Sequence, residues 1–343
     1  MTQTVFVTGG AGYVGSHCCK AFSEAGWSVV VYDNLSRGWR DFVRWGPLIE
    51  GDILDYEALS SAMAQVKPDI VAHFAAVAYV GESVADPGRY YLTNTSGSLN
   101  VLRAMQQAGV ESILFSSSCT TYGVPKATPI SEDHPQAPIS PYGWSKLVVE
   151  QMLRDFGAAH GLRSVALRYF NASGADPGGE IGERHEPEPH LIPLAIRAAM
   201  PGDFELSIFG GDFETPDGTC IRDYVHVSDL SDAHLKAISY LQAGGASDVF
   251  NLATGAGASV IEITKAVERV GGHPVRYKMG PRRQGDPAAL VASADKAARI
   301  LGWRPSRSSL DQIVADAWKW HAQDNASGRD LELIQIQNTS EMP

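Results

Sequence analysis

The chain has 343 residues, of which 44% are apolar and 20% charged, the composition of an ordinary globular protein. That length is too great for one comfortable core, so we expect a large domain with a second lobe. The net charge of −11 argues against nucleic acid or an anionic membrane as a partner. The four cysteines include no CxxC pair, and no basic and apolar leader opens the chain, so a cytoplasmic location is expected.

Short apolar runs alternate with helix-length segments through the first half of the chain. The runs lack the alternation of half-exposed strands and predict buried parallel strands at residues 4–8, 28–32, 69–74, 112–116 and 164–168. This βαβ pattern predicts an α/β fold with a doubly wound parallel sheet of the Rossmann type. The regularity ends after Phe170 in a segment rich in glycine and proline. Two later runs, 224–227 and 249–254, could rejoin the sheet, with a helix near 229–243 between them.

A glycine-rich turn, TGGAGYVGSH, follows the first predicted strand and opens a helix. The small residues Gly9, Gly12 and Gly15 let the backbone approach a pyrophosphate, whose charge the helix amides would meet. Asp33 ends the second predicted strand, where a carboxylate accepts from a ribose 2′-hydroxyl and repels a 2′-phosphate. The pattern therefore predicts NAD rather than NADP. Asp52 could reach the adenine, although a turn residue fits its spacing equally well.

A tyrosine and a lysine share one face of a later helix. In SPYGWSK, Ser140 can cap the helix and Pro141 suits its first position, which places Tyr142 and Lys146 one turn apart. A lysine ammonium near a phenol lowers the pKa of the phenol and brings it toward the working range of a base. Ser118 lies just beyond the fifth predicted strand, at the edge where such sheets bind ligands, and could hold a substrate oxygen.

These stretches together resemble the extended short-chain dehydrogenases/reductases and, within them, the UDP-glucose 4-epimerases. The resemblance runs from about residue 4 to 322 and rests on VTGGAGYVGSH, YDNLSRG, HFAAVAYVGESV, SSSCTTYG, PYGWSK, LRYFNASGA, DGTCIRDYVHVSDL, NLATGAGASV and RRQGDP. It implies interconversion of UDP-glucose and UDP-galactose through a transient 4-keto sugar, with NAD as the cofactor. It also implies a catalytic trio of Ser118, Tyr142 and Lys146, and a homodimer.

The resemblance assigns two further groups of residues. The NAD-binding residues would be Gly9, Gly12, Tyr13, Val14, Gly15, Asp33, Asn34, Asp52, Ile53, Phe74, Ala75, Ala76, Ala78, Thr93, Tyr142, Lys146 and Phe170. The UDP-sugar would contact Ser118, Tyr142, Asn171, His190, Leu191, Phe209, Arg222, Arg283, Asp286 and Leu290. The chain departs from the family pattern at four of these positions, which are Ala78 (often Lys), Thr93 (often Asn), His190 (often Asn) and Leu290 (often a larger aromatic).

The resemblance also suggests how the chain divides. We expect an NAD-binding domain of residues 1–170 and 225–252. A smaller C-terminal α/β lobe for the UDP-sugar would contain residues 171–224 and 253–325, followed by a frayed tail over 326–343.

The stretch HEPEPH at 185–190 carries two histidines. Pro187 and Pro189 exclude the helix that a zinc-binding HExxH arrangement needs to bring both histidines onto one face. The sequence therefore predicts no metal site.

Three alternatives remain at this point. A sugar-nucleotide dehydratase needs an acid/base carboxylate pair beside the serine, where this chain has Cys119 and Thr120. An epimerase for UDP-xylose/UDP-arabinose or for UDP-N-acetylglucosamine would use the same residues. A non-catalytic NAD-binding regulator would not need Tyr142 and Lys146, nor the two arginines Arg222 and Arg283.

Overall fold

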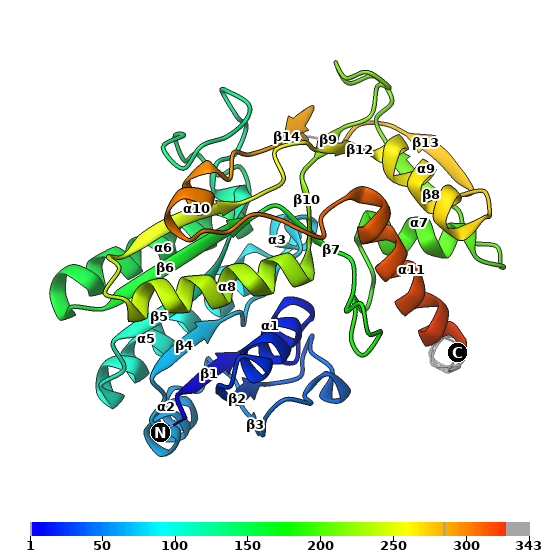
Figure 1. Cartoon of the computed structure of the whole chain (residues 1–343). Coiled ribbons are helices and arrows are strands. Elements are labelled where there is room, and N and C mark those ends of the chain that lie inside the picture. Colours follow the sequence, from blue (N-terminus) through cyan, green and yellow to red (C-terminus); the bar gives the residue numbers. More distant parts are fainter. Residues whose placement is uncertain (1, 284–285, 327–343) are drawn as a thin grey trace, which may run out of the picture.

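The computed structural model describes residues 2–283 and 286–326. Within them, seven parallel strands form the central sheet in the order β11-β6-β5-β4-β1-β2-β3 (Figure 1). The strands are β1 (Thr4–Thr8), β2 (Ser28–Asp33), β3 (Leu48–Glu50), β4 (Ile70–His73), β5 (Ser112–Ser118), β6 (Arg163–Tyr169) and β11 (Asp248–Leu252). The chain runs outward from β1 through β2 and β3, then returns to β4 and continues the other way. This is the doubly wound arrangement, so the predicted fold class is confirmed.

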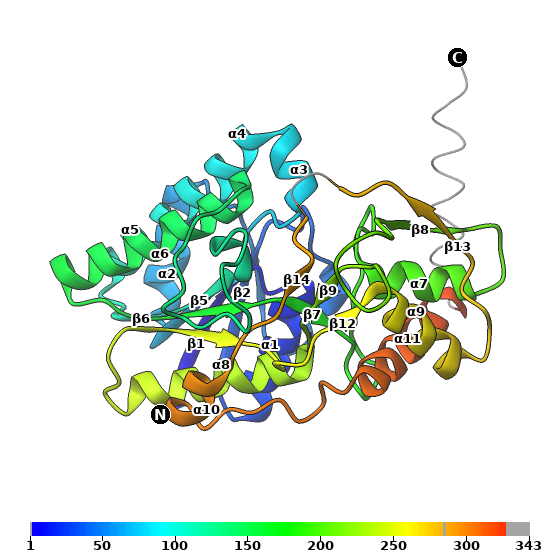
Figure 2. The ribbon, with the colours of Figure 1, turned by 90° about the horizontal axis from the view of Figure 1, so that it is seen from above.

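Helices cover both faces of the sheet (Figures 1 and 2). One face carries α1 (Tyr13–Glu24) and α8 (Val227–Gln242), and the other carries α2 (Tyr56–Val66), α5 (Gly97–Ala108) and α6 (Pro141–His160). Side chains alternate along β1, so Val5 and Val7 pack in the core of α1 and α8, whereas Phe6 packs in the core of α2, α5 and α6. Burial on both faces explains why the predicted strands are apolar throughout.

The two later apolar runs form strands in different sheets. The run at 249–254 forms β11, which joins the edge of the sheet beside β6. The run at 224–227 forms β10 (Tyr224–His226), which pairs with β7 (Asn171–Ser173) in a separate small sheet, so its predicted return to the large sheet is wrong. The reason is that β7 starts just after β6 has ended, so its partner lies beyond the edge of the large sheet.

A second core lies beyond the carboxyl edge of the sheet. It contains side chains of α7 (Leu191–Ala199), α9 (Val260–Gly271), α11 (Leu310–Ala326) and β8 (Leu206–Phe209), and the largely exposed β13 (Tyr277–Gly280) pairs with β8. Beside it, β9 (Ile221–Arg222), β12 (Ala258–Ser259) and β14 (Ala289–Leu290) form a small mixed sheet. The shorter elements are η1 (Arg40–Phe42), α3 (Val80–Ala85), α4 (Pro87–Tyr90), the π-helical η2 (Tyr91–Ser96), η3 (Cys119–Thr121) and α10 (Asp295–Ile300).

The division of the chain into two lobes stays a prediction. The predicted second lobe includes α10, whose Ala297 packs in the core of α1 and α8. The tail predicted over 326–343 lies outside the described residues except for Ala326, which ends α11.

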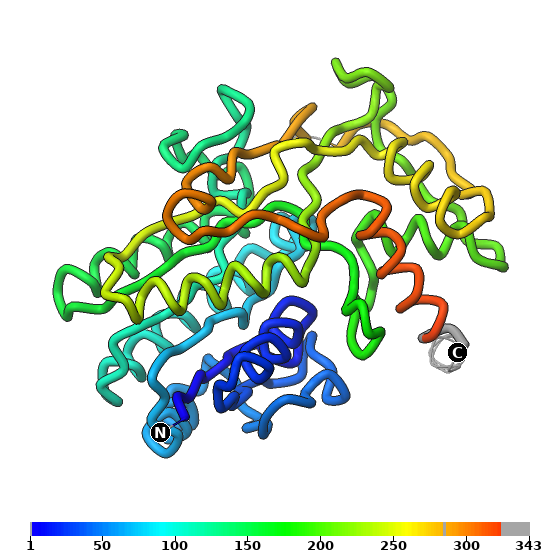
Figure 3. Tube along the Cα trace, in the orientation of Figure 1, coloured from blue at the N-terminus to red at the C-terminus, as the bar shows by residue number. Residues whose placement is uncertain are grey.

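The glycine- and proline-rich segment between β7 and α7 forms a long ordered loop between α1 and α11 (Figure 3). On the α1 side, Lys20 binds the carboxylates of Asp176 and Glu180. On the α11 side, Trp320 packs with Ile181. The loop is therefore held between the two halves of the molecule.

A buried ion pair links α6 to the sheet. Arg168 of β6 binds Glu150 of α6 through Nη2 and Oε2 at 2.5 Å and through Nε and Oε1 at 2.8 Å, and both side chains are at most 3% exposed. Ser117 of β5 donates to the same carboxylate at 2.6 Å. The Arg168 guanidinium also donates to the hydroxyl of Tyr122 at 2.9 Å. One carboxylate thus ties together β5, β6 and α6.

Replacing Glu150 should test this link. Glu150→Gln keeps the shape of the side chain but leaves the Arg168 guanidinium buried without a counter-charge. Breaking a buried pair in this way costs about 3–5 kcal/mol of unfolding free energy. Denaturant unfolding of the variant measures the loss.

Asp311→Asn is the matched control, because it breaks the exposed pair between Arg269 and Asp311. Its cost should stay below about 1 kcal/mol. Equal losses in the two variants would contradict the importance of the buried pair.

Candidate active site

A cavity of about 1160 Å³ opens at the carboxyl edge of the sheet, between the sheet and the second core. Its wall contains every residue that the sequence assigned to cofactor or substrate. These are Gly9, Gly12, Tyr13, Val14, Gly15, Asp33, Asn34, Asp52, Ile53, Phe74, Ala75, Ala76, Ala78, Thr93, Ser118, Tyr142, Lys146, Phe170, Asn171, His190, Leu191, Phe209, Arg222, Arg283, Asp286 and Leu290. The fold brings these residues together from both halves of the molecule. Their contacts with ligands stay predictions.

The glycine turn between β1 and α1 leaves no room for side chains at two positions. Gly9 has a φ of +76°, and a Cβ there would lie 2.4 Å from the amide nitrogen of Ala75. A Cβ on Gly15 would lie 2.2 Å from the carbonyl oxygen of Gly9. The N-cap of α1 is Gly12, which has no side chain to satisfy the amides that open the helix. The turn therefore presents bare backbone to the cavity, which suits a pyrophosphate.

Asp33 holds this turn as well as lining the cavity. Its Oδ2 accepts from the amide of Ala11 at 3.0 Å and its Oδ1 accepts from the amide of Leu35 at 2.8 Å. Burial raises the pKa of Asp33, and the two amide bonds offset part of that rise. The predicted contact of Asp33 with a ribose hydroxyl is thus accompanied by a structural role. The carboxylate holds the turn, which the sequence did not reveal.

Asp52 and Asn34 lie together at the same end of the cavity. Asn34 donates from Nδ2 to Oδ2 of Asp52 at 2.9 Å, and Oδ1 of Asp52 accepts from the amide of Leu54 at 2.8 Å. Asp52 is thus a turn residue, and it also lines the cavity where an adenine contact was predicted.

Ser118, Tyr142 and Lys146 meet where β5 ends and α6 begins. Ser140 caps α6 by accepting from the amide of Gly143 at 3.2 Å, and Pro141 is its first residue. Lys146 points back to the sheet and donates to the carbonyl oxygen of Ser116 at 2.8 Å. Its Nζ lies 5.8 Å from the centre of the Tyr142 ring. The predicted trio is therefore assembled in one place.

The electrostatics of this pair differ from the sequence prediction. Burial raises the pKa of Tyr142 to about 12, and its hydrogen bond with Ser118 offsets only part of this. Burial lowers the pKa of Lys146 to about 7. The expected lowering of the phenol pKa by the lysine is therefore wrong for the protein alone. The reason is that desolvation dominates and Lys146 is bonded to a backbone carbonyl.

Ser118 is oriented by a residue that the sequence did not single out. Its Oγ accepts from the amide of Thr120 at 3.2 Å and from Oγ1 of Thr120 at 3.0 Å. With two donors already directed at the oxygen, the Ser118 proton is left for the phenol oxygen of Tyr142, with which Ser118 is hydrogen-bonded in the cavity wall. The cluster of hydroxyl residues in SSSCTTYG was the only signal for this arrangement.

Asn94 is a second residue that sequence reasoning missed. It is buried, it accepts from the amide of Val77 at 2.9 Å, and it donates to the carbonyl of Val77 at 2.9 Å. It also donates to the hydroxyl of Ser145 in α6 at 3.0 Å. Asn94 thus fixes the turn after β4 against α6. The neighbouring Thr93 and Ala78, where the family pattern often has longer polar residues, line the cavity beside it.

The second core contributes arginines from two segments. Arg222 binds Oδ1 of Asp286 at 2.9 Å and donates to the carbonyl oxygen of Pro287 at 3.0 Å. The guanidinium of Arg283 stacks 4.2 Å from the centre of the Phe209 ring. Both arginines line the cavity, so this wall carries positive charge in a chain whose net charge is −11. Leu290 pairs with Arg222 across β14 and β9.

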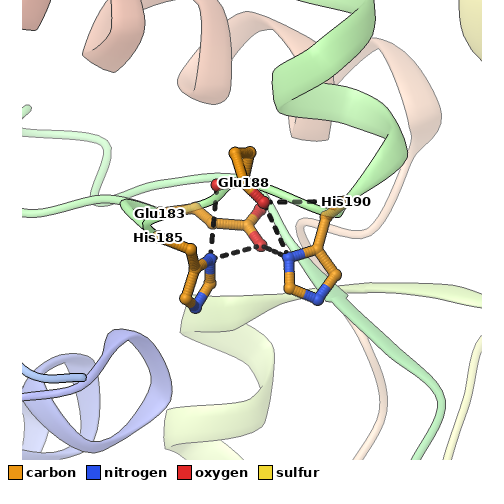
Figure 4. Close-up of side chains that lie close together, drawn as sticks. All are labelled: Glu183, His185, Glu188 and His190. Atoms are coloured by element: carbon orange, nitrogen blue, oxygen red, sulfur yellow. Dashed lines mark hydrogen bonds and ion pairs between the residues drawn. The ribbon is translucent and has the colours of Figure 1, made fainter. Parts of the chain in front are cut away.

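Four side chains of the loop before α7 converge at another part of the wall (Figure 4). The rings of His185 and His190 lie 4.9 Å apart, and Glu183 and Glu188 lie between them. Residues 182–190 form no helix, as the prolines predict, and the two histidines come together because the loop turns back on itself. Partial burial lowers the pKa of His190, and the two carboxylates raise it by more.

Comparison with known proteins gives a consistent picture. The NAD dependent epimerase/dehydratase family matches residues 5–253. The UDP-glucose 4-epimerase of Rhizobium meliloti (strain 1021) is 50% identical over 95% of this chain and 99% of its own length. The crystal structure of UDP-glucose 4-epimerase from Brucella ovis in complex with NAD is 50% identical with a TM-score of 0.90, covering 92% of this chain and 98% of that one. The UDP-Glc/GlcNAc 4-epimerase of Campylobacter jejuni is 38% identical with a TM-score of 0.82, covering 94% and 99%.

The family match spans the glycine turn, Asp33, Ser118 and the Tyr142–Lys146 pair, all of which line one cavity. The chain belongs to the NAD dependent epimerase/dehydratase family.

Proposed function

We propose that this chain is an NAD-dependent 4-epimerase that interconverts UDP-glucose and UDP-galactose through a transient 4-keto sugar. The observation that carries the proposal is the meeting of Ser118, Tyr142 and Lys146 in one cavity with the glycine turn on one side and Arg222 on the other. This places groups for proton transfer between a surface suited to a dinucleotide and a surface suited to a diphosphate.

The turn fits NAD, because its tight backbone, which leaves no room for a Cβ at Gly9 or Gly15, presents main-chain amides without side chains to the cavity. When bound, the nicotinamide supplies a reversible hydride acceptor for carbon 4 of the sugar. The residues of the chain do the remaining work. The backbone amides of the glycine turn and Asp33 would hold the dinucleotide, and the buried Lys146 is fixed near the Tyr142 ring by its bond to the carbonyl oxygen of Ser116.

Tyr142, in its phenolate form, takes the proton of the sugar 4-hydroxyl, and Ser118 donates to the same oxygen as it becomes a carbonyl. Arg222 and Arg283 hold the diphosphate while the keto sugar turns over to present its other face. Tyr142 then returns the proton. Hydride and proton both come back to the sugar, so no electrons and no protons are gained or lost in a cycle.

The residues after Ser118 support this reaction over dehydration. A dehydratase needs a carboxylate pair beside the serine, whereas Thr120 is hydrogen-bonded to Ser118 and Cys119 is buried. Burial raises the pKa of the Cys119 thiol to about 12, so this thiol is a poor base.

The first experiment uses the purified protein with no added cofactor. Because NAD is regenerated in each cycle and the cavity is deep, the protein should retain NAD(H) and convert UDP-galactose to UDP-glucose. Chromatography of the released nucleotide and of the sugar products measures both. Bound NADP, or a need for stoichiometric NADH, would contradict the proposal.

The second experiment replaces the base. Tyr142→Phe removes the phenolic oxygen and keeps the ring, so turnover should fall by at least the roughly 100-fold that acid–base catalysis contributes. Affinity for UDP, measured by calorimetry, should stay unchanged because the diphosphate is assigned to Arg222 and Arg283, and neither arginine is among the groups that shift the pKa of Tyr142. Tyr240→Phe, on the outer helix α8, is the matched control and should keep its turnover. A Tyr142→Phe protein as active as this control would exclude Tyr142 as the base.

Leu290 is proposed to set the room beside the sugar. It lines the cavity and packs on Phe170 and Cys119, next to Ser118. An aliphatic side chain leaves more space here than an aromatic one. The relative from Campylobacter jejuni is described as a UDP-Glc/GlcNAc 4-epimerase, so a wider sugar range has a precedent in the family. We therefore propose that UDP-N-acetylglucosamine or a UDP-pentose is converted as a secondary substrate.

Filling this space should narrow the range of substrates. Leu290→Tyr is expected to reduce activity on UDP-N-acetylglucosamine more than on UDP-galactose. Apolar fit of this kind is worth about 1–3 kcal/mol, so the change in relative kcat/KM should be roughly 10- to 100-fold. Parallel assays of both sugars measure it. Complete rejection of N-acetylated and pentose substrates by the unchanged protein would disprove the argument.

We also propose a homodimer. Trp144 of α6 and Leu92 of the neighbouring η2 are large apolar side chains about half exposed, which is typical of an interaction surface. The mass of the purified protein in solution will decide this.

Over residues 2–283 and 286–326, no helix combines the length and apolar character needed to cross a membrane. The cytoplasmic location stays a prediction.

A further inference from the structure

We propose that Glu183, His185, Glu188 and His190 form a site for one divalent transition-metal ion, with Zn²⁺ as its first candidate. Imidazole nitrogens and carboxylate oxygens are ligands that zinc accepts, and four of them complete a closed structural site. None of the four side chains belongs to the catalytic trio, although Glu183, His185 and His190 line the same cavity and His190 is a predicted UDP-sugar contact.

The positions of the donor atoms support the site. Nδ1 of His190 lies 2.8 Å from Oε1 of Glu183 and 2.9 Å from Oε1 of Glu188. Nδ1 of His185 lies 3.6 Å from Oε1 of Glu183 and 3.3 Å from Oε2 of Glu188. Four ligands around a tetrahedral zinc with bonds of about 2.0 Å lie roughly 3.3 Å from one another. With one donor atom taken from each residue, the four atoms lie within 4.8 Å of one another, so rotations of the side chains could bring them to these distances around one ion.

The orientation of the rings points the same way. Both histidines turn the same ring nitrogen, Nδ1, toward the carboxylates, and Figure 4 shows the four side chains directed at one point. Tyr13 and Tyr79 pack edge-on against the His185 ring, at 6.2 Å and 5.8 Å between ring centres. These aromatic walls fix the ring and shield the site on that side.

The charge of the cluster also calls for a cation. Glu183 is 5% exposed, and an ionised carboxylate at such depth needs a positive partner. Among the basic side chains nearby, Lys20 binds Asp176, and Arg37 binds Glu82 and the carbonyl oxygen of Glu186. Arg184, which lies between Glu183 and His185 in the sequence, binds Asp41. A metal ion held by the four side chains would supply that charge. Both rings direct Nδ1 at the carboxylates, which is the arrangement that four ligands of one ion require.

The place of the cluster in the fold gives the metal a structural task. His190 is the N-cap of α7 in the second core, and Tyr13 opens α1 after the glycine turn. Tyr13 also donates to the carbonyl oxygen of Gly174 at 2.6 Å, so the start of the loop is already attached to that helix. An ion bound by residues 183–190 would rigidify the part of the loop that lines the cavity, between the dinucleotide half and the second core.

The test uses full-length protein without a histidine tag, purified without chelators. Its metal content is measured by inductively coupled plasma mass spectrometry. The protein is then stripped with EDTA and titrated with Zn²⁺ against a chromogenic chelator. We expect close to one tightly bound metal ion per chain. Co²⁺ in place of zinc should give the visible d–d absorption of a four-coordinate site.

Matched variants locate the ion. His185→Gln and Glu188→Gln each remove one ligand and should weaken zinc binding by more than the roughly 10- to 100-fold that loss of an outer-shell partner costs. His273→Gln, at an exposed histidine away from the loop, is the control and should bind zinc as the unchanged protein does. Circular dichroism and the content of retained NAD verify that each variant is folded.

Two results would overturn the proposal. One is a protein that binds no Zn²⁺ in competition with the chelator, or binds it equally well after His185→Gln, which would leave the cluster as an imidazolium–carboxylate network. The other is a six-coordinate Co²⁺ spectrum, which would indicate loose surface binding. The cobalt spectrum of the unchanged protein decides the question even if the variants do not fold.

Discussion

The arrangement of the catalytic groups depends on the buried pair of Glu150 and Arg168. Ser118 ends β5, whereas Tyr142 and Lys146 belong to α6, so their distances are set by how that helix sits on the sheet. Apolar packing alone would allow the helix to slide, because it has no directional preference. The carboxylate of Glu150 accepts from β5 and β6 at once and fixes both the depth and the rotation of α6. A polar link at this point is thus as important to the chemistry as the residues that perform it.

The buried position of Tyr142 and Lys146 has an electrostatic consequence. The same burial that fixes Tyr142 and Lys146 shifts the pKa of both toward their neutral forms. Burying two titratable side chains costs free energy of folding, so stability alone would favour neither Tyr142 nor Lys146 at this place. The arginines of the second core are held by other contacts: Arg222 is bound to Asp286 and Arg283 is stacked on Phe209, which positions both guanidinium groups at the cavity wall. Proton transfer and anion binding are therefore separated between the two halves of the molecule.

Local patterns were enough to predict much of this. The glycine turn, Asp33 and the pair Tyr142–Lys146 are encoded within a few residues by spacing along a strand or a helix, and the apolar runs located the strands. Pairings between distant segments were not readable. The bond of Asn94 to Val77, the placement of β10 beside β7 and the convergence of His185 with His190 all depend on loop conformation. The pKa of Tyr142 was also mispredicted, because burial depends on the whole fold.

The two bonds of Asp33 bear on any attempt to change the coenzyme of this protein. The obvious redesign toward NADP would exchange this acid for a small or basic residue, to admit a 2′-phosphate. In this chain the same exchange would release the amides of Ala11 and Leu35, which shape the phosphate-binding turn itself. Asp33 thus combines the predicted role in coenzyme selectivity with a role in holding the turn. A successful redesign has to supply new acceptors for those two amides at the same time as it makes room for the extra phosphate.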